Sequence, residues 1–286
     1  MYFALGQEPI IKDLLLLAMQ SSPSVTYDSL AKLRNGYHGF LSTKQPRYTF
    51  DCPELLFVSD AKLSEKLMSY YTYGDEGVPS IEPSLDSGTS EKRLRQVRDG
   101  LTYLRSKDPV LGSLISTIVN IVFFHPAAHR GGGSTPQAFG IIWCNPSPKW
   151  TPIDFVEFLV HEFTHQALFL DEQVHTYFKD RSLLSNTDTF VLSSIRHSKR
   201  RLDLSLHSLM VATEIVLLRS KLGLEDSERH LHPATQNLLS TSINTATAIL
   251  EMDHLYGLLT KRAQFLTEIC LKKLESERLQ REIAII

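Results

Sequence analysis

The chain has few cysteines, little excess charge of either sign and no long hydrophobic run. Its 286 residues include three cysteines, Cys52, Cys144 and Cys270, too few and too scattered for a disulfide framework or a Cys-x-x-Cys metal site. Isolated thiols are typical of a reducing compartment, so we expect a cytoplasmic protein. A formal net charge of −2 gives no indication of nucleic acid as a partner.

No stretch of the sequence is long and apolar enough to span a bilayer. The N-terminal segment contains the apolar run 14–18, but Glu8 and Asp13 precede it and a basic n-region is missing. These features favour a buried helix over a signal peptide. A membrane is therefore not an expected partner.

The functional hypothesis starts from the HEFTH sequence of residues 161–165. Two histidines four residues apart on a helix are offset by about 40° and one turn, so the imidazoles of His161 and His165 can reach one metal ion. Glu162 then sits beside the metal without binding it, placed to handle a proton of a bound water or substrate. The alternative is two ordinary histidines on a helix surface.

The residues before this motif predict that it lies in a helix. Thr151 is typical of an N-cap, Pro152 of the first helical position, and Asp154 of the residue that completes a capping box. Apolar residues then recur at spacings that bury most of the helix surface. They are Phe155, Val156, Leu159, Val160 and Phe163.

The whole pattern predicts a mostly α fold with a small β-sheet beside the metal helix, a zincin-like α+β arrangement. Further helices are expected at 7–35, 61–73, 91–105, 110–119 and 202–222. From residue 235 to the C-terminus we expect one or two long helices, with Gly257 as the candidate position for a kink. Strands are expected at 118–124 and 139–145, and loops at 36–60 and 74–90. The two strands form either a plain hairpin or a wall of the cleft beside the metal.

Two further expectations concern organisation. Residues 1–90 are expected to form an N-terminal helical and loop region, and residues 91–286 a metal-site domain with the C-terminal helices, unless both belong to one domain. The glycine-rich run 131–136 lacks the Gly-Lys-Ser/Thr ending of a phosphate loop. We expect it to be a mobile loop near the site.

A catalytic metal needs a third protein ligand besides two histidines. His207 and Glu214 lie seven residues apart, on one face of the expected helix 202–222. Both are set among apolar residues, where an unpaired polar group is costly. We favour His207, with Glu214 as the alternative, and a core histidine bonded to a backbone carbonyl remains the competing interpretation of His207.

Asp171 and His175 are weaker candidates for the third ligand. Asp171 points about 120° away from His165 if the helix continues, and His175 can reach the metal only if the helix ends near Leu170. The next segment is basic and contains Arg196, His197, Lys199, Arg200 and Arg201. Such a run either forms a solvated turn or offers a guanidinium to a carboxylate of a substrate or co-substrate.

The order of these features resembles the HExxH peptide-modification proteins of ribosomal-peptide gene clusters, which are regarded as 2-oxoglutarate-dependent peptide β-hydroxylases. The resemblance spans roughly residues 95–220. It is carried by Lys107-Asp108-Pro109, by 139–142 and 159–165, and by Ser193, Arg196, Arg200, Leu202, Leu206 and His207. The chain departs from the family at Ser194 and Ile195, where Pro and Trp are usual, and at Leu204-Ser205, where Gly-Val is usual.

The resemblance implies that His161, His165 and His207 hold Fe(II) and that Arg196 or Arg200 binds 2-oxoglutarate. It also implies hydroxylation of a side-chain β-carbon in a ribosomally made precursor peptide. A zinc peptidase is the main alternative, with Glu162 as general base and the strand at 139–144 aligning a peptide. A third hypothesis is a module that only holds a peptide, with or without a structural metal.

Overall fold

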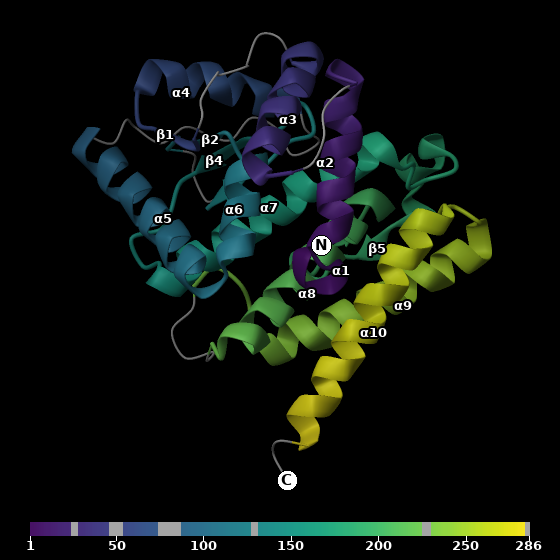
Figure 1. The fold of residues 1–286 in the computed structure, drawn as a ribbon. Helices are drawn as coiled ribbons and strands as arrows, with labels where there is room; N and C mark the ends of the chain where they lie inside the picture. Colours follow the sequence, from purple (N-terminus) through teal and green to yellow (C-terminus); the bar gives the residue numbers. More distant parts are fainter. Residues whose placement is uncertain (24–27, 46–53, 74–86, 127–130, 225–229, 284–286) are drawn as a thin grey trace. The chain divides into compact units, whose positions relative to one another are not determined.

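Helices dominate the chain, which the computed structural model describes at residues 1–23, 28–45, 54–73, 87–126, 131–224 and 230–283 (Figure 1). The expected mostly α fold with a small sheet is confirmed. The chain forms two units: the sheet unit, Ile10–Leu170, and the helical unit, Met1–Pro9 with Asp171–Ile286. The boundary expected at residue 90 falls inside the sheet unit. None of the helices in the described ranges has the length and apolarity to cross a membrane.

The sheet has four short strands in the order β1-β2-β4-β3. They are β1 Leu56–Val58, β2 Ile121–Phe124, β3 Gly132–Gly133 and β4 Ile141–Cys144. β1, β2 and β4 are parallel, and β3 runs antiparallel to β4. Every residue of β2 and β4 is buried, as expected for parallel strands covered on both faces. The two expected strands are therefore confirmed, but as parallel neighbours and not as a hairpin.

The glycine-rich run contains an edge strand where the sequence predicted only a loop. A Cβ on Gly132 would lie 2.3 Å from the Phe158 ring, and a Cβ on Gly133 would lie 2.6 Å from the Trp143 indole nitrogen. Only glycine allows the backbone to approach these rings so closely. The prediction was wrong here because strand propensity disfavours glycine, whereas close packing requires it.

Among the described residues, six helices belong wholly or mostly to the sheet unit. They are α2 Gln7–Ser21, α3 Leu30–Lys44, α4 Ala61–Met68, α5 Ser87–Lys107, α6 Pro109–Ile118 and α7 Pro152–Val174, with a 3-10 helix at Ser69–Tyr73 after α4. The loop expected from residue 36 is wrong as far as Lys44, because α3 continues through Gly39. A Cβ there would lie 2.8 Å from Ser21 Oγ, so this glycine allows close packing of α2 and α3. The loops expected at 46–53 and 74–86, and Cys52, lie outside the described residues.

One face of the sheet is covered by α4, and α7 lies on the other side of the strands (Figure 1). The core under α4 consists of Leu67, Met68, Tyr70, Ile121, Phe123, Ala138, Ile141 and Trp143. These strand residues alternate along β2 and β4, so the intervening residues face the opposite side of the sheet. The sheet therefore lies between α4 and α7.

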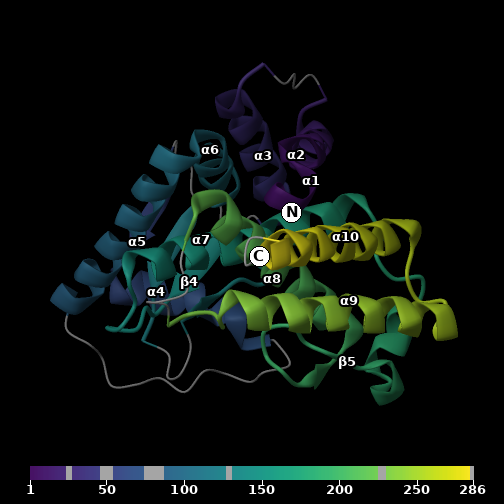
Figure 2. The ribbon, with the colours of Figure 1, turned by 90° about the horizontal axis from the view of Figure 1, so that it is seen from below.

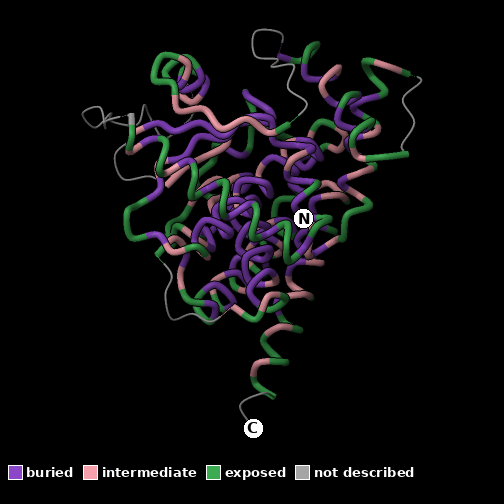
Figure 3. Tube along the Cα trace, turned by 60° about the vertical axis from the view of Figure 1, so that its left-hand side comes forward, coloured by how far each residue is buried: buried purple, intermediate pink, exposed green. Residues whose placement is uncertain are grey.

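The helical unit is built on three long helices, α8 Leu202–Leu222, α9 Thr235–Tyr256 and α10 Lys261–Ile283, which lie side by side in Figure 2. α8 is buried around nearly its whole circumference. Gly257 ends α9 in a left-handed conformation with φ 63°, so the expected kink is a helix end. Figure 3 shows the C-terminal turns of α10 exposed.

Smaller elements complete the helical unit. They are α1 Tyr2–Leu5, the hairpin of β5 Val191–Leu192 and β6 Lys199–Arg200, and 3-10 helices at Arg181–Ser185 and Thr187–Thr189. The hairpin is joined to α8 through a hydrogen bond of 2.8 Å between the hydroxyls of Ser193 and Ser208. The basic segment thus sits on a hairpin held to the helix that carries His207.

The start of α7 is as the sequence predicts. The Asp154 carboxylate accepts hydrogen bonds from the Thr151 amide (2.8 Å) and hydroxyl (3.0 Å), next to Pro152 at the first helical position. Further along, the buried Gln166 accepts a hydrogen bond from the Gly140 amide (2.8 Å) and donates one to the Ile141 carbonyl (3.1 Å). A side chain within the helix thus ties α7 to the beginning of β4.

We expect Gln166→Leu to lower the free energy of unfolding by about 1–3 kcal/mol, because it leaves the buried Gly140 amide without its acceptor. The Ile141 carbonyl keeps a hydrogen bond from the Tyr71 hydroxyl, at 2.8 Å. Gln173→Leu, at an exposed position of α7, is the matched control and should change stability by less than about 0.5 kcal/mol. Urea unfolding measures both; equal effects would show that Gln166 does not anchor the helix.

Candidate metal centre

His161 and His165 lie one turn apart on α7, with ring centroids 5.0 Å from each other and ring planes inclined by 60°. Two imidazole nitrogens that bind one zinc or iron ion at about 2.0–2.1 Å are at most roughly 4 Å apart. Rings at this spacing can turn a nitrogen each toward one ion. Both side chains are half-buried, so a metal between them remains reachable from solvent.

Glu162 is held beside the pair by a residue of the glycine-rich segment. The Ser134 hydroxyl donates a hydrogen bond of 2.7 Å to Glu162 Oε2, and Glu162 Oε1 lies 3.9 Å from His161 Nε2. The Glu162 residue is only 3% exposed. One carboxylate oxygen is thus fixed by the protein while the other faces the histidine.

Two groups near Glu162, Tyr71 and Cys144, are neutral. Burial raises the pKa of the Tyr71 phenol, and the negative charge of Glu162 raises it further. Burial also raises the pKa of the Cys144 thiol; Arg93 lowers it, and Glu162 again contributes to the rise. Both groups therefore stay protonated at neutral pH.

The motif presents two stripes of side chains on α7. Glu162 and Gln166, four residues apart, share the stripe that is bonded to β3 and β4 through Ser134, Gly140 and Ile141. His161 and His165 share a stripe that is rotated by about 100° from the first. The sheet therefore fixes which way the two histidines point.

Within the described part of the sheet unit, no three His, Cys, Asp or Glu side chains that include both motif histidines have ligand atoms within 4.8 Å of one another. A third ligand therefore has to be sought among the other candidates. His207, Glu214, Asp171 and His175 all belong to the helical unit.

His207 has a carboxylate as a hydrogen-bond partner. Its Nε2 lies 2.9 Å from Glu172 Oε1, and it is 8% exposed. Burial raises the pKa of Glu172, but the hydrogen bond and charge of His207, together with Arg181, outweigh burial and lower it. Glu172 follows His165 by seven residues on α7, so its side chain leaves this helix on the same side as the motif histidines.

Glu214 binds the first residues of the chain. Its Oε1 lies 2.6 Å from the Met1 ammonium, and its oxygens accept hydrogen bonds of 2.9 Å from the Phe3 and Ala4 amides. Both members of the ion pair are completely buried. Glu214 thus caps α1, and these contacts favour His207 over Glu214 as the third ligand.

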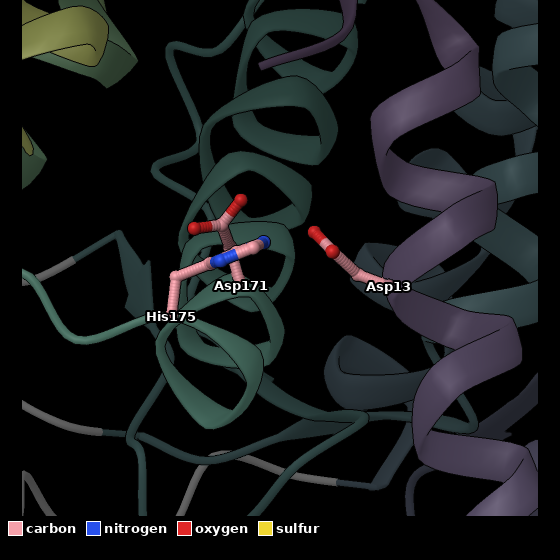
Figure 4. Close-up of side chains that lie close together, drawn as sticks. All are labelled: Asp13, Asp171 and His175. Atoms are coloured by element: carbon pink, nitrogen blue, oxygen red, sulfur yellow. The ribbon is translucent and has the colours of Figure 1, made fainter. Parts of the chain in front are cut away.

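The two weaker candidates lie at the end of α7. Figure 4 shows Asp171 and His175 on successive turns of the chain there, and the His175 amide donates to the Asp171 carbonyl at 2.7 Å. The Asp171 carboxylate forms a bidentate ion pair with Arg262, in which Nε lies 3.1 Å from Oδ1. Asp13, also labelled in Figure 4, is a residue of α2 in the sheet unit. The ion pair makes Asp171 a poor ligand candidate.

The two arginines of the basic segment differ in setting. Arg196 is exposed in the turn between β5 and β6, where its amide donates to Ser193 Oγ at 3.3 Å. Arg200 is half-buried in β6, two residues before α8 begins. Arg196 therefore matches the expected solvated turn, and Arg200 is the less exposed of the two arginines.

Comparison with protein-family models finds no match for this chain, and a search of curated proteins finds no relative.

Two residues that contact candidate site residues, Ser134 and Glu172, were not predicted from the sequence. Ser134 follows a glycine run and has no spacing that marks it, and Glu172 lies beyond the motif. The only available signal for Glu172 was its position seven residues after His165, which places it on the histidine side of the helix.

We expect His161→Ala and His165→Ala each to abolish retention of a bound divalent metal, because two protein ligands do not hold a catalytic ion. Glu162→Gln should keep the metal, since it preserves both imidazoles. His254→Ala removes an exposed histidine of α9 and is the control. Metal content after dialysis, measured by mass spectrometry, tests this; metal retained in both histidine variants would contradict it.

A second pair of variants tests the third ligand. His207→Ala should also abolish metal retention, whereas Glu214→Ala should leave the metal content of the folded protein within about twofold. Glu214→Ala should instead lower the free energy of unfolding by about 3–5 kcal/mol, since it leaves a buried ammonium unpaired. Metal loss from folded Glu214→Ala with metal retained by His207→Ala would reverse the assignment.

Proposed function

We propose that this chain is a non-haem Fe(II)- and 2-oxoglutarate-dependent oxygenase that hydroxylates a side-chain β-carbon of a ribosomally made precursor peptide in the cytoplasm. The observation that carries the metal site is the pair of imidazoles, His161 and His165, 5.0 Å apart beside a carboxylate fixed by Ser134. The choice of iron and of hydroxylation follows the family resemblance. We also propose that the sheet and α7 form a zincin-like core.

The donor set suits such a metal. With His207 as third ligand, three imidazoles bind iron or zinc and leave positions open for a co-substrate. When bound, Fe(II) supplies the redox chemistry that couples O₂ and 2-oxoglutarate to hydroxylation. Free thiols at Cys144 and Cys270 agree with a reducing compartment.

The protein groups have separate tasks in this proposal. Glu162 accepts a proton near the metal through Oε1, while Ser134 keeps Oε2 fixed. Arg200 binds a carboxylate of 2-oxoglutarate by a charge-assisted hydrogen bond. The buried surroundings of Glu162 keep bulk water from exchanging freely with this carboxylate.

A zinc peptidase is the second candidate, favoured by the HExxH motif with Glu162 as general base. In that interpretation the strand at 139–144 aligns a peptide. However, β4 is paired with β2 along its length and with β3 at Trp143 and Cys144. The Ile141 carbonyl accepts from Tyr71 and Gln166. The strand therefore has little free backbone to offer, which favours the oxygenase.

Anaerobic reconstitution with Fe(II), followed by addition of O₂, 2-oxoglutarate and candidate precursor peptides, tests the proposal. We expect succinate to form and the peptide mass to rise by one oxygen atom. Glu162→Gln should reduce turnover while it retains iron. Peptide cleavage by the zinc-loaded protein, without succinate, would overturn the oxygenase assignment in favour of the peptidase.

Arg196 provides the control for the assignment of Arg200 to 2-oxoglutarate. Arg200→Gln should raise the KM for 2-oxoglutarate about 10–100-fold, the loss of one charge-assisted hydrogen bond, whereas Arg196→Gln should raise it less than threefold. Steady-state succinate formation measures both. The opposite order would assign the co-substrate to Arg196.

A further inference from the structure

The carboxyl ends of the two central strands lie beside the glycine-rich segment. The parallel strands β2 and β4 end at Phe124 and Cys144, which are neighbours in the sheet. The Asn145 amide, one residue beyond β4, donates a hydrogen bond of 2.9 Å to the Gly131 carbonyl. Ligands of open α/β sheets commonly bind outside the carboxyl ends of the strands. A ligand is therefore expected at this edge of the sheet unit.

Helix α5 places a guanidinium at the same edge. Arg93 is half-buried; its Nη1 donates a hydrogen bond of 2.7 Å to Asn145 Oδ1, and its Cζ lies 5.6 Å from the centroid of the Phe124 ring. Among the residues that the structure describes, no carboxylate forms an ion pair with Arg93. A guanidinium has five N–H donors, and neither an amide nor an aromatic ring neutralises its charge. Arg93 is thus an oriented cation with donors to offer an anion.

His125 adds a buried polar atom to this edge. It follows Phe124, its amide donates to the Cys144 carbonyl at 3.1 Å, and the residue is 4% exposed. Its buried Nδ1 has no hydrogen-bond partner in the described part of the chain. Burial lowers the pKa of His125, and the charge of Glu65 raises it by less, so the imidazole is neutral at pH 7. Because a buried polar atom without a partner is costly, Nδ1 indicates a ligand that forms a hydrogen bond.

The edge adjoins the surroundings of the motif carboxylate. Ser134, three residues after Gly131, donates the hydrogen bond of 2.7 Å to Glu162. The Arg93 charge lowers the pKa of the Cys144 thiol, whereas the Glu162 charge raises it. Both charges therefore lie within electrostatic range of one side chain, and all these residues belong to the sheet unit.

We propose that Arg93 binds a carboxylate of the peptide substrate, with His125 donating a hydrogen bond to the same group. The carboxylate site rests on contacts within the sheet unit alone, whereas its assignment to a peptide rests on the proposed function. A guanidinium can hold a carboxylate by two parallel N–H···O bonds, and the contacts to Asn145 and Phe124 fix its orientation. A neutral imidazole protonated at Nδ1 supplies one more donor. The substrate expected here is a peptide with an acidic side chain.

Calorimetric titration of the full chain with short peptides tests the proposal without metal or turnover. The probes are the acetylated and amidated tripeptides Gly-Glu-Gly and Gly-Gln-Gly, which differ in one charge, and 2-oxoglutarate. We expect the wild-type protein to bind the glutamate peptide about 10–100-fold more tightly than the glutamine peptide, the effect of charge-assisted hydrogen bonds. Arg93→Gln should abolish this preference. Arg95→Gln removes an exposed arginine of the same helix and should change it less than threefold.

Two further variants test the geometry of the site. Arg93→Lys keeps the charge but loses the planar fork, so it should retain only part of the preference. His125→Phe keeps a buried ring without its nitrogens and should weaken binding of the glutamate peptide about 2–10-fold, the loss of one neutral hydrogen bond. Circular dichroism identifies any variant that fails to fold. In the wild-type protein, which needs no variant, the glutamate peptide should slow modification of Arg93 by phenylglyoxal, mapped by mass spectrometry.

The outcomes separate the carboxylate site from its occupant. Equal affinity of the wild-type protein for the two peptides and no binding of 2-oxoglutarate, or equal losses in Arg93→Gln and Arg95→Gln, overturn the site. Binding of 2-oxoglutarate alone, lost in Arg93→Gln, supports the site and overturns its assignment to the peptide. Absence of metal binding or of succinate formation overturns the proposed function and leaves these titrations unchanged.

Discussion

The rotation of α7 about its own axis is set by two side chains on one stripe, Glu162 and Gln166. Glu162 accepts from Ser134, and Gln166 binds the backbone at Gly140 and Ile141. A helix held at two points one turn apart cannot turn without losing buried hydrogen bonds, each costly to leave unmade. The histidines lie about 100° around the helix axis from this stripe. The hydrogen bonds to the sheet therefore fix the direction in which the histidine side chains leave the helix.

The two oxygens of the Glu162 carboxylate have different surroundings. Its buried carboxylate helps to fasten α7 to the segment after β3, and its second oxygen lies 3.9 Å from His161 Nε2. Tyr71 and Cys144, which stay protonated, do not neutralise it. A cation beside His161 would interact favourably with this carboxylate.

Local signals explain what could be predicted from sequence. The capping residues Thr151 and Asp154 and the following apolar spacing fixed the start and type of α7, because both act within one turn of the chain. The strand at Gly132 was missed, since its reason is the nearby Phe158 ring and not its own propensity. Ser134 was missed for the same cause: its contact joins residues 28 positions apart, and no local pattern encodes such a pair.

The oxygenase and peptidase hypotheses differ in the protein groups that must bind the substrate or co-substrate. A peptidase needs free backbone groups along a strand to align the scissile peptide, and β4 has most of its own engaged. An oxygenase that uses 2-oxoglutarate needs a cation for a carboxylate, and we propose for this role the half-buried Arg200, close to the start of the His207 helix. A guanidinium in partly buried surroundings binds a carboxylate more strongly than one in water, because screening by solvent is weaker. The charge of Arg200, and not the motif shared by both enzyme classes, is therefore the feature that separates the two hypotheses.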